Sequence, residues 1–198
     1  MITTFLFDLG GVLYTNGSKK FISDISKKYH LSEILVEDII DGKIGSHYRE
    51  AKITRDEFWQ QVIEKLNLSE DVDTLEKQWV DEYELIEETK SILLQLAKKY
   101  QLYYLSDNVK ERVEVLDKKF HFTKLFKGGI FSHEVGVRKP NPKIYELALH
   151  KSKSRPDKTI FIDDKAQMLL PAKKLGIHTL LFSTPENLKS DLKRMKII

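Results

Sequence analysis

Short apolar runs alternate with helical patterns along most of the chain. Five runs are typical of buried parallel strands, the last of them weaker than the others: residues 2–7, 102–105, 159–162, 178–182 and 129–132. Between these runs, apolar residues recur at helical spacing in four segments: residues 89–100, 109–119, 142–150 and 165–175. Strands that alternate with helices predict βαβ units, and therefore an α/β fold built on a doubly wound parallel sheet.

Residues 15–82 interrupt this alternation, because they contain several helix starts and no convincing strand. Ser18, Ser32 and Thr54 are candidate N-caps, and Glu57 would complete a capping box with Thr54. We expect this segment to be a small helical cap inserted into a core domain. The predicted core domain consists of residues 1–14 and 83–198, with hinges near 14–17 and 82–88.

The composition excludes some classes of function but does not by itself indicate one. The chain is 41% hydrophobic and 32% charged with a net charge of +3, so its bulk charge does not point to nucleic acid. The absence of cysteine excludes disulfides, thiolate metal sites and a cysteine nucleophile. Both tryptophans, Trp59 and Trp79, are expected to pack in the interior.

No signal sequence or membrane-length apolar run is found, so we expect a cytoplasmic protein without membrane or nucleic-acid partners. The last segment carries Leu188, Leu192 and Met195 at helical spacing, which favours packing on the core over a membrane-surface helix. The oligomeric state stays open between a monomer and a weak homodimer.

Carboxylates follow two of the predicted strands. Asp8 ends the first apolar run, and Asp163 and Asp164 follow residues 159–162. The carboxyl ends of parallel strands form the binding crevice of an open α/β sheet. Carboxylates about 4 Å apart there would repel by roughly 4 kcal/mol per pair at an effective dielectric near 20. A cation held by oxygen ligands is therefore predicted, and such a site suggests phosphate chemistry.

Other polar groups lie at or near strand ends. Gly10 and Gly11 let the chain turn tightly and bring backbone N–H groups toward an anion. Ser106 and Asn108 follow residues 102–105, and Lys139 precedes a helix start marked by prolines. The three aspartates carry −3, which Lys139 and one Mg²⁺ would balance. Such a site can accept a phosphate dianion.

Four clusters of polar residues thus follow one another along the chain: Asp8–Gly11, Ser106–Asn108, Lys139 and Asp163–Asp164. Taken in order, they resemble the motifs of the haloacid dehalogenase-like (HAD) hydrolase superfamily. The resemblance extends from Phe5 to about Phe182 and includes the place of the helical insertion. The segments Phe-Asp-Leu-Gly-Gly-Val-Leu and Phe-Ile-Asp-Asp are similar to those of small phosphatases. That subgroup includes sugar-phosphate phosphatases and the phosphatase domains of epoxide hydrolases.

The resemblance implies a Rossmann-like core and a role for each motif residue. Asp8 would be the nucleophile and a Mg²⁺ ligand, and Gly10 would lend its carbonyl to the ion. Asp164 would be a direct metal ligand, with Asp163 as its neighbouring or alternative partner. The substrate's phosphoryl group would be held by Ser106, Asn108, Lys139 and the Gly10–Gly11 turn, and Lys139 would also balance the charge of the nucleophile.

The sequence departs from the family pattern at Gly10, where most phosphatases of the superfamily have a second Asp that acts as general acid and base. General acid catalysis typically contributes about 10²–10⁴-fold. A phosphatase with Gly10 would favour leaving groups that need little protonation, such as anomeric sugar, acyl and aryl phosphates. Alternatively Tyr14, His47 or Tyr48 could supply the acid from the cap.

Two other functions stay open at this point. The chain could be a phosphate-binding or regulatory protein with little activity, or a metal-independent 2-haloacid dehalogenase, although the Asp163–Asp164 pair has little purpose without a cation. The size of the cap favours small phosphorylated metabolites over phosphoproteins. His30, His47, Tyr48 and Arg49 are candidate substrate contacts on its inward face.

Overall fold

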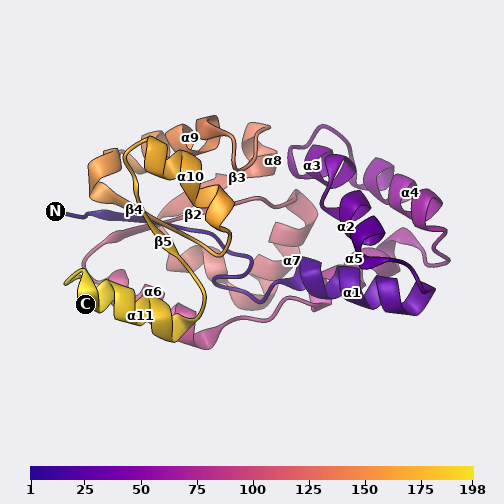
Figure 1. Cartoon of the computed structure of the whole chain (residues 1–198), viewed down its shortest axis with the longest axis horizontal. Coiled ribbons are helices and arrows are strands. Elements are labelled where there is room, and N and C mark those ends of the chain that lie inside the picture. The colour runs from indigo at the N-terminus through magenta and orange to yellow at the C-terminus, as the bar shows by residue number, and fades with distance from the viewer.

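The computed structural model describes all 198 residues and contains one five-stranded parallel sheet in the order β3-β2-β1-β4-β5. The strands are β1 (Thr4–Phe7), β2 (Gln101–Ser106), β3 (Gly128–Phe131), β4 (Thr159–Asp163) and β5 (His178–Leu181). All five predicted strands are present. The α/β fold with a doubly wound sheet is therefore confirmed (Figure 1).

The register of the central strand determines which residues meet at the carboxyl edge of the sheet. Phe7, the last residue of β1, pairs with Tyr104 of β2 on one side and with Ile162 of β4 on the other. The backbone N–H of Asp8 continues this ladder and donates to the Ile162 carbonyl at 2.9 Å. Asp8 therefore emerges between the ends of β2 and β4.

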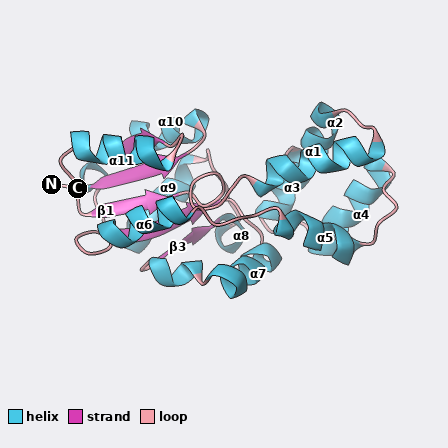
Figure 2. Ribbon diagram, turned by 90° about the horizontal axis from the view of Figure 1, so that it is seen from below, coloured by secondary structure: helices cyan, strands magenta, loops and turns pink.

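Helices cover both faces of the sheet (Figures 1 and 2). The helices that follow or flank the strands are α6 (Glu87–Leu96), α7 (Lys110–Phe120), α8 (Ser132–Val135), α9 (Pro142–Ser152), α10 (Ala166–Lys174) and α11 (Pro185–Arg194), with short 3-10 turns at Phe122–Leu125 and Pro156–Lys158. In Figure 1, α9 and α10 lie on one face, and α6 and α11 lie on the other. The four helical patterns in the sequence correspond to α6, α7, α9 and α10.

Five further helices, all from residues 17–81, lie together beyond the carboxyl edge of the sheet (Figures 1 and 2). They are α1 (Gly17–Tyr29), α2 (Glu33–Ile40), α3 (Lys43–Arg49), α4 (Arg55–Leu66) and α5 (Val72–Asp81), and we call residues 17–81 the helical segment. The absence of strands from this stretch agrees with its sequence pattern. Its boundaries as a separate cap remain a prediction.

Helix starts in the helical segment follow local capping chemistry. Thr54 accepts a hydrogen bond from the backbone N–H of Glu57 at 3.2 Å, and the Glu57 carboxylate accepts one from the backbone N–H of Thr54 at 2.8 Å. The predicted capping box is therefore present. The prediction for Ser18 is wrong: Asn16 caps α1, and the Ser18 hydroxyl instead lies 3.0 Å from the hydroxyl of Tyr83.

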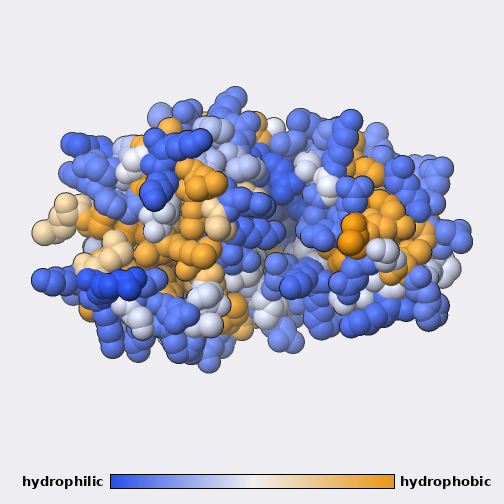
Figure 3. Space-filling view, viewed as in Figure 1, coloured by the Kyte–Doolittle hydropathy of each residue, from blue (hydrophilic) through white to orange (hydrophobic).

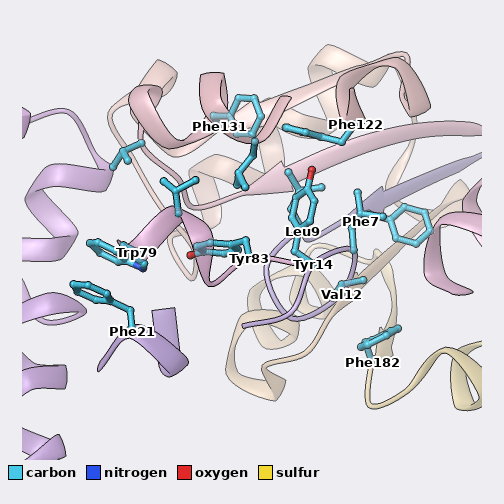
Figure 4. Packing of buried hydrophobic residues seen from close by; sticks show 14 of the residues in the cluster. Phe7, Leu9, Val12, Tyr14, Phe21, Trp79, Tyr83, Phe122, Phe131 and Phe182 are labelled. Atoms are coloured by element: carbon cyan, nitrogen blue, oxygen red, sulfur yellow. The ribbon is translucent and has the colours of Figure 1, made fainter. Parts of the chain in front are cut away.

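One hydrophobic cluster of 37 buried residues extends from the helical segment to the sheet. Trp59 and Trp79 are fully buried in it, as predicted, and Trp79 stacks on Phe21 with ring centroids 5.2 Å apart (Figure 4). In α11, Leu188 and Leu192 join the same cluster, whereas Met195 is 38% exposed. None of the helices combines the length and apolar character that a membrane span requires.

Candidate active site

Three carboxylates converge at the carboxyl edge of the sheet. Asp8 follows β1, Asp163 ends β4 and Asp164 comes directly after it, and one oxygen from each lies within 4.8 Å of the others. Such a cluster can hold a divalent cation, because hard cations prefer carboxylate oxygens. The parallel pairing of β1 with β4 thus unites residues more than 150 positions apart in the chain.

Lys139 lies in the middle of this acidic cluster. Its Nζ is 3.0 Å from Oδ1 of Asp8 and 2.6 Å from Oδ2 of Asp163, and the residue is 2% exposed. The backbone N–H of Lys165 donates to the other oxygen of Asp163 at 2.9 Å. Both oxygens of Asp163 are therefore engaged, which makes this residue better suited to hold Lys139 than to bind a cation directly.

The carboxylate of Asp164 has an oxygen that no protein group pairs with. Its Oδ1 is buried and has no hydrogen-bond partner, which is costly unless a cation pairs with it. The other oxygen lies against Gly11: a Cβ on Gly11 would be 2.3 Å from Oδ2 of Asp164, and the φ of Gly11 is +80°. Glycine at position 11 therefore provides both the backbone conformation and the space for this carboxylate.

The electrostatics of the cluster favour a bound cation. Burial raises the pKa of Asp8; Lys139 opposes this, Asp163 and Asp164 add to it, and the pKa reaches about 8. Burial together with the Asp163 charge also raises the pKa of Asp164. Burial alone would lower the pKa of Lys139, but the carboxylates of Asp163 and Asp8 outweigh it and keep the ammonium charged. A divalent ion would relieve the repulsion among the acids.

A pocket opens beside these groups and is lined by Asp8, Gly10, Ser106, Asn108 and Lys139. The Ser106 hydroxyl makes no hydrogen bond within the protein, while Oδ1 of Asn108 accepts one from the backbone N–H of Val109 at 2.9 Å. This leaves the side-chain N–H₂ of Asn108 available. A Cβ on Gly10 would meet no atom within 4 Å, so the first side-chain atom of another residue fits at this position.

The same pocket contains polar residues that the sequence analysis did not identify. Asp107 accepts hydrogen bonds from the backbone N–H of Lys139 at 3.0 Å and from Nε of Arg138 at 3.3 Å. Asp107 and Arg138 are neighbours of motif residues in the sequence. Their ion pair joins residues 31 positions apart, and no pattern in a single sequence indicates such a contact. Ser18, expected only as a helix cap, also lines the pocket, and the remaining pocket residues not singled out from the sequence are Asn16, Asp41, Tyr83, Lys165 and Met168. Figure 3 shows a mainly hydrophilic surface between the sheet and the helical segment.

The residues expected on the inward face of the cap, and Tyr14 as a candidate acid, lie in different parts of the structure. Arg49 and Tyr14 line the pocket, whereas His47 and Tyr48 line two other clefts. The Tyr48 hydroxyl donates to Glu111 at 3.2 Å, so it is not aimed at Asp8. His30 forms the C-cap of α1 and does not line the pocket.

The fold and the acidic edge of the sheet define an α/β protein with a candidate metal-binding active site, and similarity to known proteins identifies the family. The family model described as haloacid dehalogenase-like hydrolase matches residues 2–176. The chain belongs to this family.

Individual relatives agree with this assignment. The chain is 24% identical to a D-ribitol-5-phosphate phosphatase of Bacteroides thetaiotaomicron, over 94% of this chain and 93% of that protein. A local match to bifunctional epoxide hydrolase 2 of Rattus norvegicus is 40% identical over 52 residues, which is 26% of this chain and 9% of that protein. Both agree with the resemblance seen in the motifs.

A solved structure shares the fold. It is a HAD family enzyme from Bacteroides thetaiotaomicron in complex with magnesium and inorganic phosphate, with a TM-score of 0.74 and 23% sequence identity. The alignment covers 92% of this chain and 95% of that chain.

Proposed function

We propose that this HAD-like hydrolase is a Mg²⁺-dependent phosphatase that hydrolyses small phosphorylated metabolites, sugar phosphates among them, through an aspartyl phosphate on Asp8. The observation that carries the proposal is the cluster of three carboxylates within 4.8 Å, with Nζ of Lys139 3.0 Å from Asp8. A relative that is a D-ribitol-5-phosphate phosphatase and a neighbour crystallised with magnesium and phosphate support it.

The residues present suit Mg²⁺. Asp8, Asp164 and the Gly10 carbonyl would hold the ion, with Asp163 beside them. The partnerless Oδ1 of Asp164 is the observation that favours a cation here. Few protein ligands and several positions left for water or phosphate favour Mg²⁺ over Ca²⁺. Bound Mg²⁺ would neutralise charge on the phosphoryl oxygens and orient them.

The proposed reaction transfers the phosphoryl group in two steps, first to Asp8 and then to water. Oδ1 of Asp8 is held by the backbone N–H of Leu9 at 2.7 Å and by Lys139, which leaves Oδ2 free to attack phosphorus. The new Asp8–phosphorus bond forms as the ester P–O bond breaks, and the leaving oxygen takes a proton from solvent. Water then attacks the aspartyl phosphate, which releases inorganic phosphate and restores the carboxylate.

Ser106, Asn108 and Lys139 would hold the phosphoryl oxygens during both steps. Preorganised donors of this kind stabilise the charge that develops on transfer, and they account for much of the catalysis of phosphoryl transfer. We further propose that residues 15–82 act as a cap that limits access to the pocket and excludes bulky substrates.

The absence of a second Asp at position 10 would restrict the leaving group. The other pocket carboxylates, Asp41 and Asp107, are both paired with arginines, and neither occupies the position of the missing Asp. We therefore infer a preference for acyl, aryl and anomeric sugar phosphates over primary alkyl phosphates. Equal or faster hydrolysis of alkyl phosphates would contradict this part of the proposal.

A phosphatase screen with and without Mg²⁺, using the wild type and Asp8→Asn, tests the proposed function. We expect phosphate release that requires Mg²⁺ and that Asp8→Asn abolishes while the variant keeps its melting temperature within a few degrees. Activity that is unaffected by chelation, or that survives in Asp8→Asn, would contradict the proposal.

Gly10 also favours a second candidate, a phosphate-binding protein with little turnover, because the usual proton donor is missing. Against it stands the free Oδ2 of Asp8, which a pure binding site does not need. Formation of a fluoroberyllate adduct on Asp8, without turnover across a broad panel of phosphate esters, would support this candidate.

A further inference from the structure

The helical segment contributes an ion pair to the pocket that contains Asp8. Asp41 follows the end of α2, Arg49 ends α3, and both line the pocket. Neither belongs to the motifs at the strand ends, and the proposed phosphoryl transfer uses neither. Their position on the helical segment places them where the leaving group of a bound phosphate ester would extend.

Arg49 is buried and held in place by partners within the helical segment. It is 6% exposed, Nη1 donates to the Ile40 carbonyl at 3.2 Å, and Nη2 pairs with Oδ1 of Asp41. Its guanidinium carbon also lies 5.7 Å from the centroid of the Trp79 ring. Arg49 therefore serves to orient Asp41 rather than to bind a second anion.

Asp41 presents one unused oxygen. Its side chain is 30% exposed and Oδ1 is held by Arg49, while Oδ2 makes no hydrogen bond within the protein. Burial alone would raise the pKa of Asp41, but Arg49 and Lys165 outweigh it and lower that pKa. The group is therefore an ionised carboxylate whose free oxygen accepts hydrogen bonds and donates none.

Two donors without protein partners line the same pocket. Lys165 is exposed, and its ammonium makes no hydrogen bond within the protein. Asn16 uses its side-chain oxygen to cap α1 by accepting from the backbone N–H of Lys19 at 3.1 Å, which leaves its N–H₂ group available. One fixed acceptor and two donors are thus present beyond the phosphate-binding residues.

Building on the proposed phosphatase function, we propose that Asp41, Asn16 and Lys165 form a subsite for the hydroxyl groups of a sugar leaving group. A hydroxyl both donates and accepts, so adjacent hydroxyls satisfy the carboxylate and the two donors together. The pocket would therefore select phosphate esters whose leaving group carries several hydroxyls.

Other leaving groups match the subsite less well. A second phosphate could pair with Lys165 but would bring its charge against Asp41, and an amine could pair with Asp41 but would bring its charge against Lys165. The pocket's two aromatic residues, Tyr14 and Tyr83, are 1% and 6% exposed, so they offer no ring face on which an aryl group or base could stack.

The test is a ratio of rates for two substrates in the presence of Mg²⁺. We would measure kcat/KM for α-D-glucose 1-phosphate, an anomeric sugar phosphate, and for acetyl phosphate, whose leaving group carries no hydroxyl. Asp41→Asn should lower the ratio of the first value to the second about tenfold or more, because a hydrogen bond to a charged group is lost. Lys165→Met should lower the same ratio. Because this variant keeps the Asp41–Arg49 ion pair, it still tests the subsite if Asp41→Asn folds poorly.

Glu37→Gln is the matched control, because Glu37 is an exposed carboxylate on the same helix that does not line the pocket. Its ratio should equal that of the wild type. If Lys165→Met and a folded Asp41→Asn leave the ratio unchanged, or if the wild type prefers ethanolamine phosphate to the sugar phosphate, the subsite is refuted while the phosphatase function stands. If the wild type hydrolyses no phosphate ester or acyl phosphate at all, the proposed function itself fails.

Discussion

The two glycines after Asp8 are adjacent but have different structural requirements. Gly10 has open space around its Cβ position and ordinary backbone angles, whereas Gly11 has a φ of +80° and lies against Asp164. Position 10 is therefore free for substitution and position 11 is not. This contrast separates the two residues that sequence alone treats as one turn.

We predict that Gly11→Ala weakens Mg²⁺ binding at least tenfold and lowers the free energy of unfolding by about 1–2 kcal/mol, the usual cost of left-handed backbone in a non-glycine residue. The added Cβ would displace the carboxylate of Asp164. Calorimetric titration with Mg²⁺ and urea unfolding would measure both effects. Gly10→Ala is the matched control and should change neither by much; equal effects of the two substitutions would refute the assignment.

We predict that Gly10→Asp introduces a proton donor and increases turnover of primary alkyl phosphates by at least tenfold. A Cβ at position 10 would meet no atom within 4 Å, and general acid catalysis contributes about 10²–10⁴-fold where the leaving group is a poor one. Turnover of an aryl phosphate should change much less. Steady-state kinetics on an alkyl and an aryl phosphate check this, and a uniform change in both would contradict it.

Short α8 connects the helical segment to the loop that carries Asn108. Ser132, at its start, is fully buried; its hydroxyl donates to the Arg49 carbonyl at 2.6 Å and accepts from the backbone N–H of Asn108 at 3.1 Å. Nδ1 of His133 lies 2.9 Å from the Asn108 carbonyl. Both backbone groups of Asn108 are thus held by α8, and Ser132 is the link to α3.

We predict that Ser132→Ala lowers the free energy of unfolding by about 1–3 kcal/mol, because buried backbone groups lose their partner. If Ser132 positions the loop, KM for a phosphate substrate should also rise, since Asn108 would be held less firmly. Chemical unfolding and steady-state kinetics measure the two effects. Ser91→Ala is the control, because Ser91 makes a similar hydroxyl-to-carbonyl bond on the exposed side of α6. A loss of stability with unchanged KM would limit Ser132 to a structural role.

The charge balance of the whole site predicts how stability depends on pH. The pKa of Asp8 is about 8 in the folded chain and near 3.8 in a free carboxyl, so between these values the folded state binds more protons than the unfolded state. The free energy of unfolding of the metal-free chain should therefore fall as the pH rises from about 4 to about 8. Mg²⁺ should oppose this fall, because it replaces the proton.

Urea unfolding at several pH values, with chelator and with Mg²⁺, would test the pH dependence. Asp8→Asn removes the titrating group, so its metal-free stability should depend less on pH over this range. A wild type whose metal-free stability rises with pH, or equals Asp8→Asn in its pH dependence, would contradict the account.

Strand ends made much of this molecule predictable from sequence. Apolar runs that stop at Asp8, Ser106 and Asp163 revealed both the strands and the polar groups at their ends, because a parallel sheet gathers its carboxyl ends at one edge. The pairing of Arg49 with Asp41 was not predictable. It depends on how helices of the segment pack together, and no motif surrounds either residue. The Ser18 prediction failed because a hydroxyl near a helix start can bond elsewhere.

In the proposed reaction, Asp8 receives the phosphoryl group with the help of a divalent ion. Acid quenching during turnover of acetyl phosphate, followed by mass spectrometry of the peptides, measures this directly. We predict a phosphoryl group on Asp8 when Mg²⁺ is present, and none with chelator or in Asp8→Asn. Turnover with an unmodified Asp8, or equal labelling without a divalent ion, would contradict the account.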